Sequence, residues 1–219
     1  MGQYHMVVNL DKREYISPHK LGAGLKLWEQ LANGEIGGTG GALLVLLACS
    51  NGRGGGDFDV GENWHGPERE FPRDNGQGGP MPEDYPTIAA RTIGRWAGDR
   101  IAVVGDYAED GDLAPEHHAG SVYTLCHDRE DIEESAGYAE KMAVEAEMSV
   151  SKAVHGETAA EWRERAEFLR ETGPFADISD DVLAVMSHEL HLVVDETQGW
   201  REIRRAGEGD AIAPDTVAA

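Results

Sequence analysis

Positive charge is scarce in this sequence, and lysine is the scarcest source of it. The 219 residues contain 19 Lys and Arg against 41 Asp and Glu, which gives a formal net charge of −22. Because attraction to nucleic-acid phosphates and to anionic membranes depends on clustered Lys and Arg, we expect neither as a partner. The carboxylates are spread along the chain rather than gathered in one tail. This pattern indicates adaptation to molar salt, which screens the repulsion between them.

Cysteine and long apolar runs are also scarce. Two cysteines, Cys49 and Cys126, cannot make a disulfide framework, and we predict both to be small buried hydrophobes. The longest apolar stretch, 42–48, falls far short of the roughly 18 residues that a membrane-spanning helix needs. The N-terminal segment lacks the basic and apolar regions of a secretory signal. We therefore expect a protein of the cytoplasm of a high-salt organism, or of a virion.

Strand patterns in the first half of the chain predict a small, mostly antiparallel sheet. β-branched and aromatic residues at 4–10 and 14–16 flank a turn and predict one hairpin. The segments 91–96 and 100–107 predict a second hairpin, and the continuous apolar run 101–104 places its second arm at the centre of the sheet. The helices predicted to cover this sheet are 20–32, 42–49 and 180–194.

Residues 51–87 differ in kind from their surroundings. They hold nine glycines and five prolines, with only scattered large apolar residues. Such a stretch cannot build its own core, so it predicts a long loop. The end of the chain, 206–219, is small, acidic and weakly patterned, and it predicts a loosely held tail.

Residues 129–173 carry the clearest pattern and predict two helices in an αα-hairpin. Apolar residues recur every three or four positions, and Thr158 with Glu161 matches the capping box that begins a helix. Packing inside the hairpin and contact with a partner are both open readings of this alanine-rich seam. The residues predicted for a helix-mediated interface are Ala136, Ala143, Val150 and Trp162.

These elements together predict an α+β fold. The core domain is expected to comprise 1–128 and 174–205. The helical hairpin 129–173 is an expected appendage to it, and the tail follows.

One helical stripe raises the question of a metal site. His188, His191 and Asp195 would share a face if the helix ran on, and imidazoles with a carboxylate can hold zinc, manganese or iron. The motif is H-x-x-H rather than H-E-x-x-H, and the stripe lies opposite the valines of the same helix. We therefore interpret it as a solvated face, and expect no metal and no other cofactor.

Five polar residues form the candidate catalytic set. Asp99, Arg100 and Asp106 belong to the predicted hairpin, and a residue just past a buried strand is often functional. His19 and Lys20 precede the first helix. The competing interpretation is turn chemistry, in which Asp99 caps its hairpin and Asp106 opens a loop.

Two segments resemble an uncharacterised family. They are MGQYHMVVNLDKRE at 1–14 with PHKLGAGLKL at 18–27, and GRWAGDRIAVVGDY at 94–107; a weaker match is Asp-Ile-Ser at 177–179. Members of that family occur in tailed phages, bacteria, haloarchaea and some eukaryotes. The resemblance implies no catalytic role, since the family has no established activity. It does imply that 129–172 is an insertion, because the second and third motifs lie close together in the family.

Two functions are compatible with these features. The first is a salt-adapted, non-catalytic interaction or structural protein, encoded by a virus or provirus, with the helical insertion as its assembly surface and a protein partner or a second copy bound there. The alternative is a small-molecule or metal-dependent enzyme with a pocket near the 96–107 hairpin.

Overall fold

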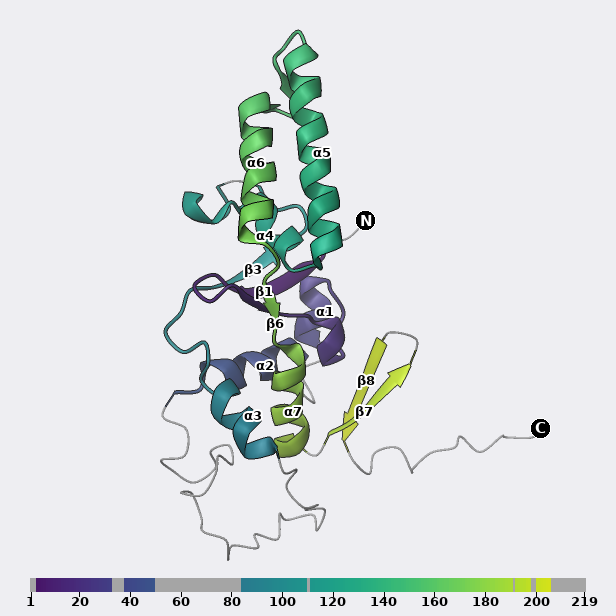
Figure 1. The fold of residues 1–219 in the computed structure, drawn as a ribbon. Helices are drawn as coiled ribbons and strands as arrows, with labels where there is room; N and C mark the ends of the chain where they lie inside the picture. The colour runs from purple at the N-terminus through teal and green to yellow at the C-terminus, as the bar shows by residue number, and fades with distance from the viewer. Residues whose placement is uncertain are drawn as a thin grey trace, which may run out of the picture. The chain divides into compact units, whose positions relative to one another are not determined.

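The computed structural model describes residues 3–32, 38–49, 84–109, 111–190, 192–197 and 200–205. Within these ranges the chain has the predicted α+β fold, with helices and a small, mostly antiparallel four-stranded sheet (Figure 1). The chain forms two compact units. The first unit comprises 1–15 and 100–177, and the second comprises 16–99 and 178–219.

The sheet is formed by strands from both segments of the first unit. Its strands are β1 (His5–Asn9), β2 (Glu14–Ile16), β3 (Ile101–Gly105) and β6 (Ala176–Asp177), in the order β3-β1-β2-β6. β1 and β3 are antiparallel, with Val7 opposite Val103, whereas β2 and β6 are parallel. The predicted strand 100–107 is thus confirmed over 101–105, but it lies at an edge of the sheet. Its Val103 is half exposed, while α4 packs against the strand.

The predicted strand 91–96 is wrong. The chain forms helix α3 (Tyr85–Thr92), with Pro86 in its first turn, and then a series of turns. Gly94 has a φ of +73°, and a Cβ there would lie 2.5 Å from the carbonyl oxygen of Ala48. The N–H groups of Gly94 and Trp96 donate to Val45 and Leu46, so hydrogen bonds to the end of α2 replace strand pairing. There is consequently no 96–107 hairpin.

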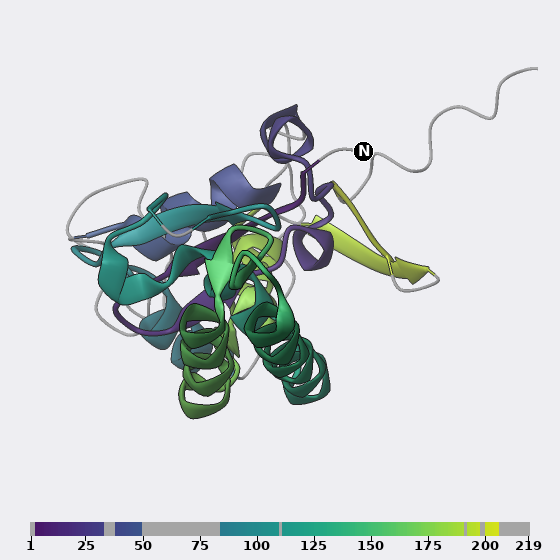
Figure 2. The same ribbon diagram turned by 90° about the horizontal axis from the view of Figure 1, so that it is seen from above.

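Two long helices dominate the first unit. α5 (Arg129–Met148) and α6 (Ala159–Thr172) run side by side, as the views in Figures 1 and 2 agree, and α4 (Ala119–Leu125) packs against both. The connection contains the short strands β4 (Ala153–Val154) and β5 (Glu157–Thr158). The capping box of Thr158 and Glu161 is confirmed. That this helix pair is an insertion stays a prediction.

The second unit is built from elements far apart in the sequence. It contains a 3₁₀ turn η1 (His19–Leu21), α1 (Leu27–Ala32), α2 (Gly38–Leu47), α3, α7 (Ser179–Leu190), β7 (Leu192–Thr197) and β8 (Trp200–Arg205). α7 packs against α2 and α3. The helix predicted over 42–49 is confirmed over 42–47, and it starts four residues earlier, at Gly38. The prediction of one helix over 20–32 is wrong: η1 ends at Leu21, Gly22 has a φ of +69°, and α1 begins only at Leu27. The helix predicted over 180–194 ends at Leu190, because the chain turns into the antiparallel β7–β8 pair.

The grouping of the chain differs from the expected division. The helix pair 129–173 belongs with the sheet in the first unit, whereas the helices expected to cover that sheet belong to the second. Residues 206–219 and most of the predicted 51–87 loop lie outside the described residues. Cys126 is buried as predicted, but Cys49 is exposed, because it follows the end of α2. Among the described helices, none is long and apolar enough to cross a membrane.

Candidate interaction surface

The inner face of α5 packs within the chain. The 4-3 spacing of its apolar residues aligns them along one side of the helix, and α6 and α4 cover that side. Alanines allow close approach of the two long helices. The buried residues of this face are Ile132, Ala136, Ala139, Met142, Ala143 and Ala146, and they meet Trp162, Ala166 and Leu169 of α6.

Trp162 anchors the helix pair. Its side chain is only 5% exposed, and its indole N–H donates to the carbonyl oxygen of Val154 at 3.2 Å. The guanidinium of Arg165 lies 4.8 Å from the centre of the indole, and Tyr138 meets the ring edge-on. Because the indole is enclosed on these sides, Trp162 stabilises the helix pair rather than a contact with another molecule.

The four predicted interface residues therefore differ in their exposure: three are buried and one is exposed. Ala136, Ala143 and Trp162 are buried by the chain's own packing and are closed to a partner, since the seam that the sequence displays is filled by α6. Val150, beyond the end of α5, is fully exposed. Any contact surface on this helix pair must use a different face.

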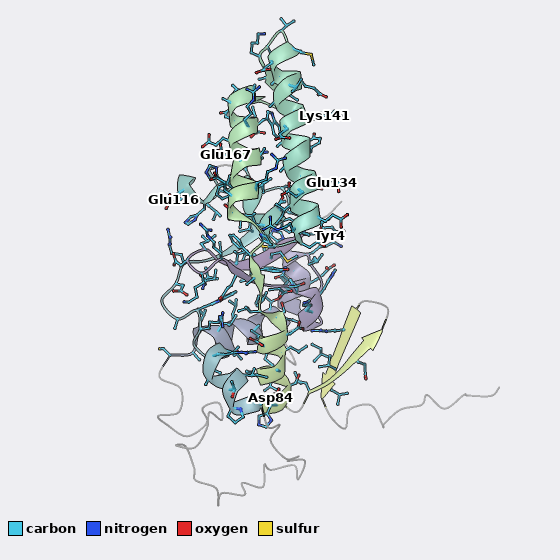
Figure 3. The ribbon with its side chains drawn as sticks, viewed as in Figure 1. Tyr4, Asp84, Glu116, Glu134, Lys141 and Glu167 are labelled. Atoms are coloured by element: carbon cyan, nitrogen blue, oxygen red, sulfur yellow. The ribbon has the colours of Figure 1, made fainter. Side chains whose placement is uncertain are left out.

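A second stripe lies on the outer face of α5. Its members are Gly137, Lys141, Val144 and Met148, spaced by four, three and four residues, and we call this set the outer stripe. Val144 and Met148 are 51% and 73% exposed. Figure 3 shows Lys141, with Glu134, on the side of α5 that faces away from α6. A Cβ added at Gly137 would meet nothing within 4 Å, so the space beside it is open. Sequence analysis missed this stripe because its lysine and glycine interrupt the apolar pattern.

Charged pairs flank the outer stripe unequally. On one flank, arginines of α6 hold the carboxylates: Arg170 pairs with Glu133 and Glu140, and Arg163 pairs with Glu147. The hydrogen bond from Arg170 lowers the pKa of Glu140 below its ordinary value, and the two glutamates raise the pKa of Arg170. On the other flank, Lys141 lies 3.9 Å from Glu145, and both are well exposed. The carboxylates of the first flank are therefore neutralised, while the second retains a loosely paired lysine and glutamate.

Arg100 and Asp106, from the candidate catalytic set, lie at opposite ends of β3. The Arg100 guanidinium donates to Asp11 at 2.8 Å and pairs with Glu116 at 3.4 Å. Asp106 accepts from the backbone N–H of Tyr4 at 3.0 Å. Because β3 separates them, these two side chains do not share a site. The hydrogen bonds from Arg100 lower the pKa of Asp11, which favours the ion pair.

These contacts also show that two motifs distant in the sequence are joined in the fold. The segment 1–14 supplies β1 and the segment 94–107 supplies β3. The two strands pair along their whole length. Asp11 and Tyr4 of the first motif hold the residues that flank β3. The side-chain oxygen of Asn9 accepts hydrogen bonds from the N–H groups of Asp11 and Lys12, and these bonds stabilise the turn between β1 and β2. Asn9, Asp11, Arg100 and Asp106 of these motifs thus have structural partners.

The other three candidates lie in the second unit. Lys20 is 3.3 Å from Asp180 at the start of α7, and Arg201 of β8 contacts the same carboxylate at 2.6 Å. Burial lowers the pKa of His19. The N–H of Asp99 donates to the carbonyl oxygen of Trp96, so Asp99 lies in a turn, although not in the turn of the predicted hairpin. Sequence reasoning missed the Lys20–Asp180–Arg201 group, because its members are distant in the chain.

The predicted metal candidates do not share one helix. His188 lies on α7 and stacks on Tyr85, with ring centres 3.8 Å apart, and the Tyr85 hydroxyl hydrogen-bonds Glu189. The face is therefore packed here rather than solvated. Asp195 lies on β7, and His191 is outside the described residues. Across the described part of the chain, no group of three or more His, Cys, Asp and Glu residues is placed to hold a metal ion.

Comparison of the chain with protein-family models, with curated proteins and with solved structures found no match. The outer stripe and the polar groups described above are therefore judged on their physical chemistry alone.

Proposed function

We propose that this is a salt-adapted, non-catalytic interaction or structural protein, and that the α5–α6 helix pair is its assembly surface. The observation that carries the proposal is the exposed apolar part of the outer stripe, Val144 and Met148, with Val150 beyond the helix end. A chain with a net charge of −22 has an abundance of polar residues for a solvated helix face. Contiguous exposed apolar side chains on such a helix are characteristic of a contact site.

The charge of the chain favours assembly under one condition only. Two bodies that each carry −22 repel strongly at low ionic strength. At 1 M salt the Debye length is about 3 Å, so this repulsion is largely removed. An apolar contact surface on an acidic protein is thus suited to a high-salt cytoplasm or to a virion. The virus or provirus origin in the proposal is supported by the resemblance to a family with phage members.

The enzyme alternative lacks a comparable observation. Its polar set would have to converge, yet Arg100 and Asp106 lie at opposite ends of β3 and are each bound to other groups of the first unit. Lys20 is bound to Asp180 within the second unit. The pocket was expected beside a hairpin, and the first arm of that hairpin is replaced by the end of α3 and turns.

The proposal is tested by measuring the molecular mass of the 219-residue protein in molar KCl. The mass is measured first in an extract of the cells that contain the protein naturally, and then after purification. We expect a mass above 23.7 kDa, either from self-association or from a bound protein. Met148→Glu should abolish the larger species. The matched control is Leu44→Glu, which places the same charge on another exposed apolar helix residue, 72% exposed on α2. A monomer under all conditions, or a larger species that Met148→Glu leaves unchanged, would contradict the proposal.

A further inference from the structure

We propose, as a deepening of the proposed function and resting on it, that the outer stripe binds the outer stripe of a second copy of this chain. The two α5 helices would run antiparallel about a two-fold axis. The proposal rests on two independent features of the stripe: complementary size and complementary charge.

The size argument concerns Gly137 and Met148. An antiparallel pairing that sets Lys141 level with Val144 of the second copy also sets Gly137 level with Met148 of that copy. The open space at Gly137 then receives the thioether side chain, which is 73% exposed in the isolated chain. Glycine in an exposed helix interior is less favourable than alanine, and none of the described residues lies within 4 Å of the place that a Cβ at position 137 would take. The open space beside Gly137 and the methionine side chain that enters it occur twice, because the contact is symmetric.

The charge argument concerns the two flanks. A two-fold axis brings the same flank of both helices together. One flank carries Lys141 and Glu145. In the proposed pairing, Lys141 of each copy lies opposite Val144 of the other copy, so it is one residue away from that copy's Glu145. The loose intrachain pair at 3.9 Å is thus joined by two interchain pairs.

On the opposite flank, carboxylates of the two copies approach each other. Glu140 and Glu147 are the residues concerned, and both are already paired with arginines of α6. The repulsion between these particular carboxylates of the two copies is therefore reduced by arginines within each chain. A basic partner would bind best to carboxylates that are not already paired. Because Glu140 and Glu147 are paired with arginines of α6, this flank favours a second copy over a basic partner.

Disulfide trapping tests the arrangement directly. The background is full-length Cys49→Ser, because Cys49 is exposed, whereas Cys126 is buried and is retained. Gly137→Cys and Met148→Cys are combined in one chain and oxidised in molar KCl. We expect covalent dimers, since a disulfide requires Cα atoms about 4.4–6.8 Å apart and the pairing sets these positions opposite each other.

The single variants are the matched controls. In the antiparallel arrangement, two copies of Met148 are separated by about 16 Å along the helices, from 1.5 Å of rise per residue, so Met148→Cys alone should not form a disulfide. The same holds for Gly137→Cys alone. Efficient trapping of either single variant would indicate parallel helices and overturn the proposal. Failure of the double variant to form dimers, with its circular dichroism unchanged, would overturn it too.

Charge exchange provides the second test, at the lowest salt that retains the dimer. Lys141→Glu should raise the dissociation constant several-fold more than Lys152→Glu, which makes the same change in net charge outside α5. Lys141→Glu combined with Glu145→Lys should restore association. Equal effects of the two lysine variants would overturn the pairing.

The two proposals fail in different ways. If the protein assembles and Met148→Glu abolishes assembly, but the double cysteine variant does not crosslink, the antiparallel pairing is wrong while the proposed function stands. A protein that neither self-associates nor binds a partner contradicts both.

Discussion

The α5–α6 helix pair and the α2–α3–α7 group show how differently two helical regions of one chain can be encoded. In the pair, the helices are joined by the segment 149–158, and α5 packs against α6, the next helix along the chain. In the group, α7 packs against helices that precede it by more than 80 residues. The first region is therefore specified by local periodicity and caps. The second depends on contacts that no local pattern reports.

The largest expected effect comes from removing the anchor of the helix pair. Trp162→Ala should lower the free energy of unfolding by about 3–5 kcal/mol, because it leaves a cavity and removes the hydrogen bond to Val154. Chemical denaturation in molar KCl measures the loss, and hydrogen exchange should locate it in α5 and α6. Trp28→Ala, at a 77% exposed position, is the control and should change stability by less than about 0.5 kcal/mol. Equal losses for both would contradict the anchoring role of Trp162.

The α2–α3–α7 group should respond to the loss of a single hydroxyl. Tyr85→Phe removes the donor to Glu189 while keeping the ring that stacks on His188. We expect a loss of about 1–3 kcal/mol, since Tyr85 is buried and the carboxylate loses a partner. Thermal unfolding compares it with Tyr107→Phe, at an exposed hydroxyl, which should be neutral. If Tyr85→Phe is neutral as well, the α3–α7 contact does not depend on this bond.

The capping box tests how far local sequence determines the helix pair. Thr158→Ala removes the side chain that accepts from the Glu161 N–H, and it should cost about 1 kcal/mol. Thr158→Ser retains the hydroxyl and should restore most of the stability. Hydrogen exchange at the first turn of α6 is the measurement. A serine variant as unstable as the alanine variant would show that the hydroxyl is not the stabilising group.

The smallest effect is electrostatic and depends on pH. Because the folded-state pKa of Glu140 lies below its ordinary 4.5, the pair with Arg170 stabilises the fold above that value. The stabilisation is lost as pH falls below 4.5 through the lowered pKa. Arg170→Met should therefore flatten the pH dependence of unfolding in this acidic window, and ¹³C NMR should show the Glu140 pKa returning toward 4.5. Molar salt should weaken the effect, because both groups are exposed. An unchanged Glu140 pKa in the variant would rule out the pair as its cause.

Several features of the fold could be predicted from the sequence, and each is local. Thr158 with Glu161 marked the start of α6, and the 4-3 spacing from Ile132 to Ala146 identified the buried face of α5. The strand at 101–105 was also correctly placed. The errors occurred where another segment decides the outcome: 94–96 bonds to the end of α2, and among the described strands β3 pairs with β1 alone.

The candidate sites were less predictable than the fold. A charge of −22 makes neighbouring carboxylates common, so proximity in sequence identified neither the Lys20–Asp180–Arg201 group nor the Tyr85–His188–Glu189 cluster. The alanine seam suggested contact with a partner, but in the structure these alanines pack against α6 of the same chain. The outer stripe became visible only when the burial of the inner face showed which residues of α5 were left exposed.

The sequence by itself determined the acidic character of this protein, its α+β class, and the buried face of α5 and the capping of α6. These properties follow from composition, from the 3.6-residue period and from hydrogen bonds between near neighbours. The tertiary structure alone decided which apolar face is covered, which strand lies at the edge of the sheet and which ionic groups pair. Those outcomes depend on which distant segments come together, because burial and ion pairing are properties of the assembled contacts rather than of the residues that enter them.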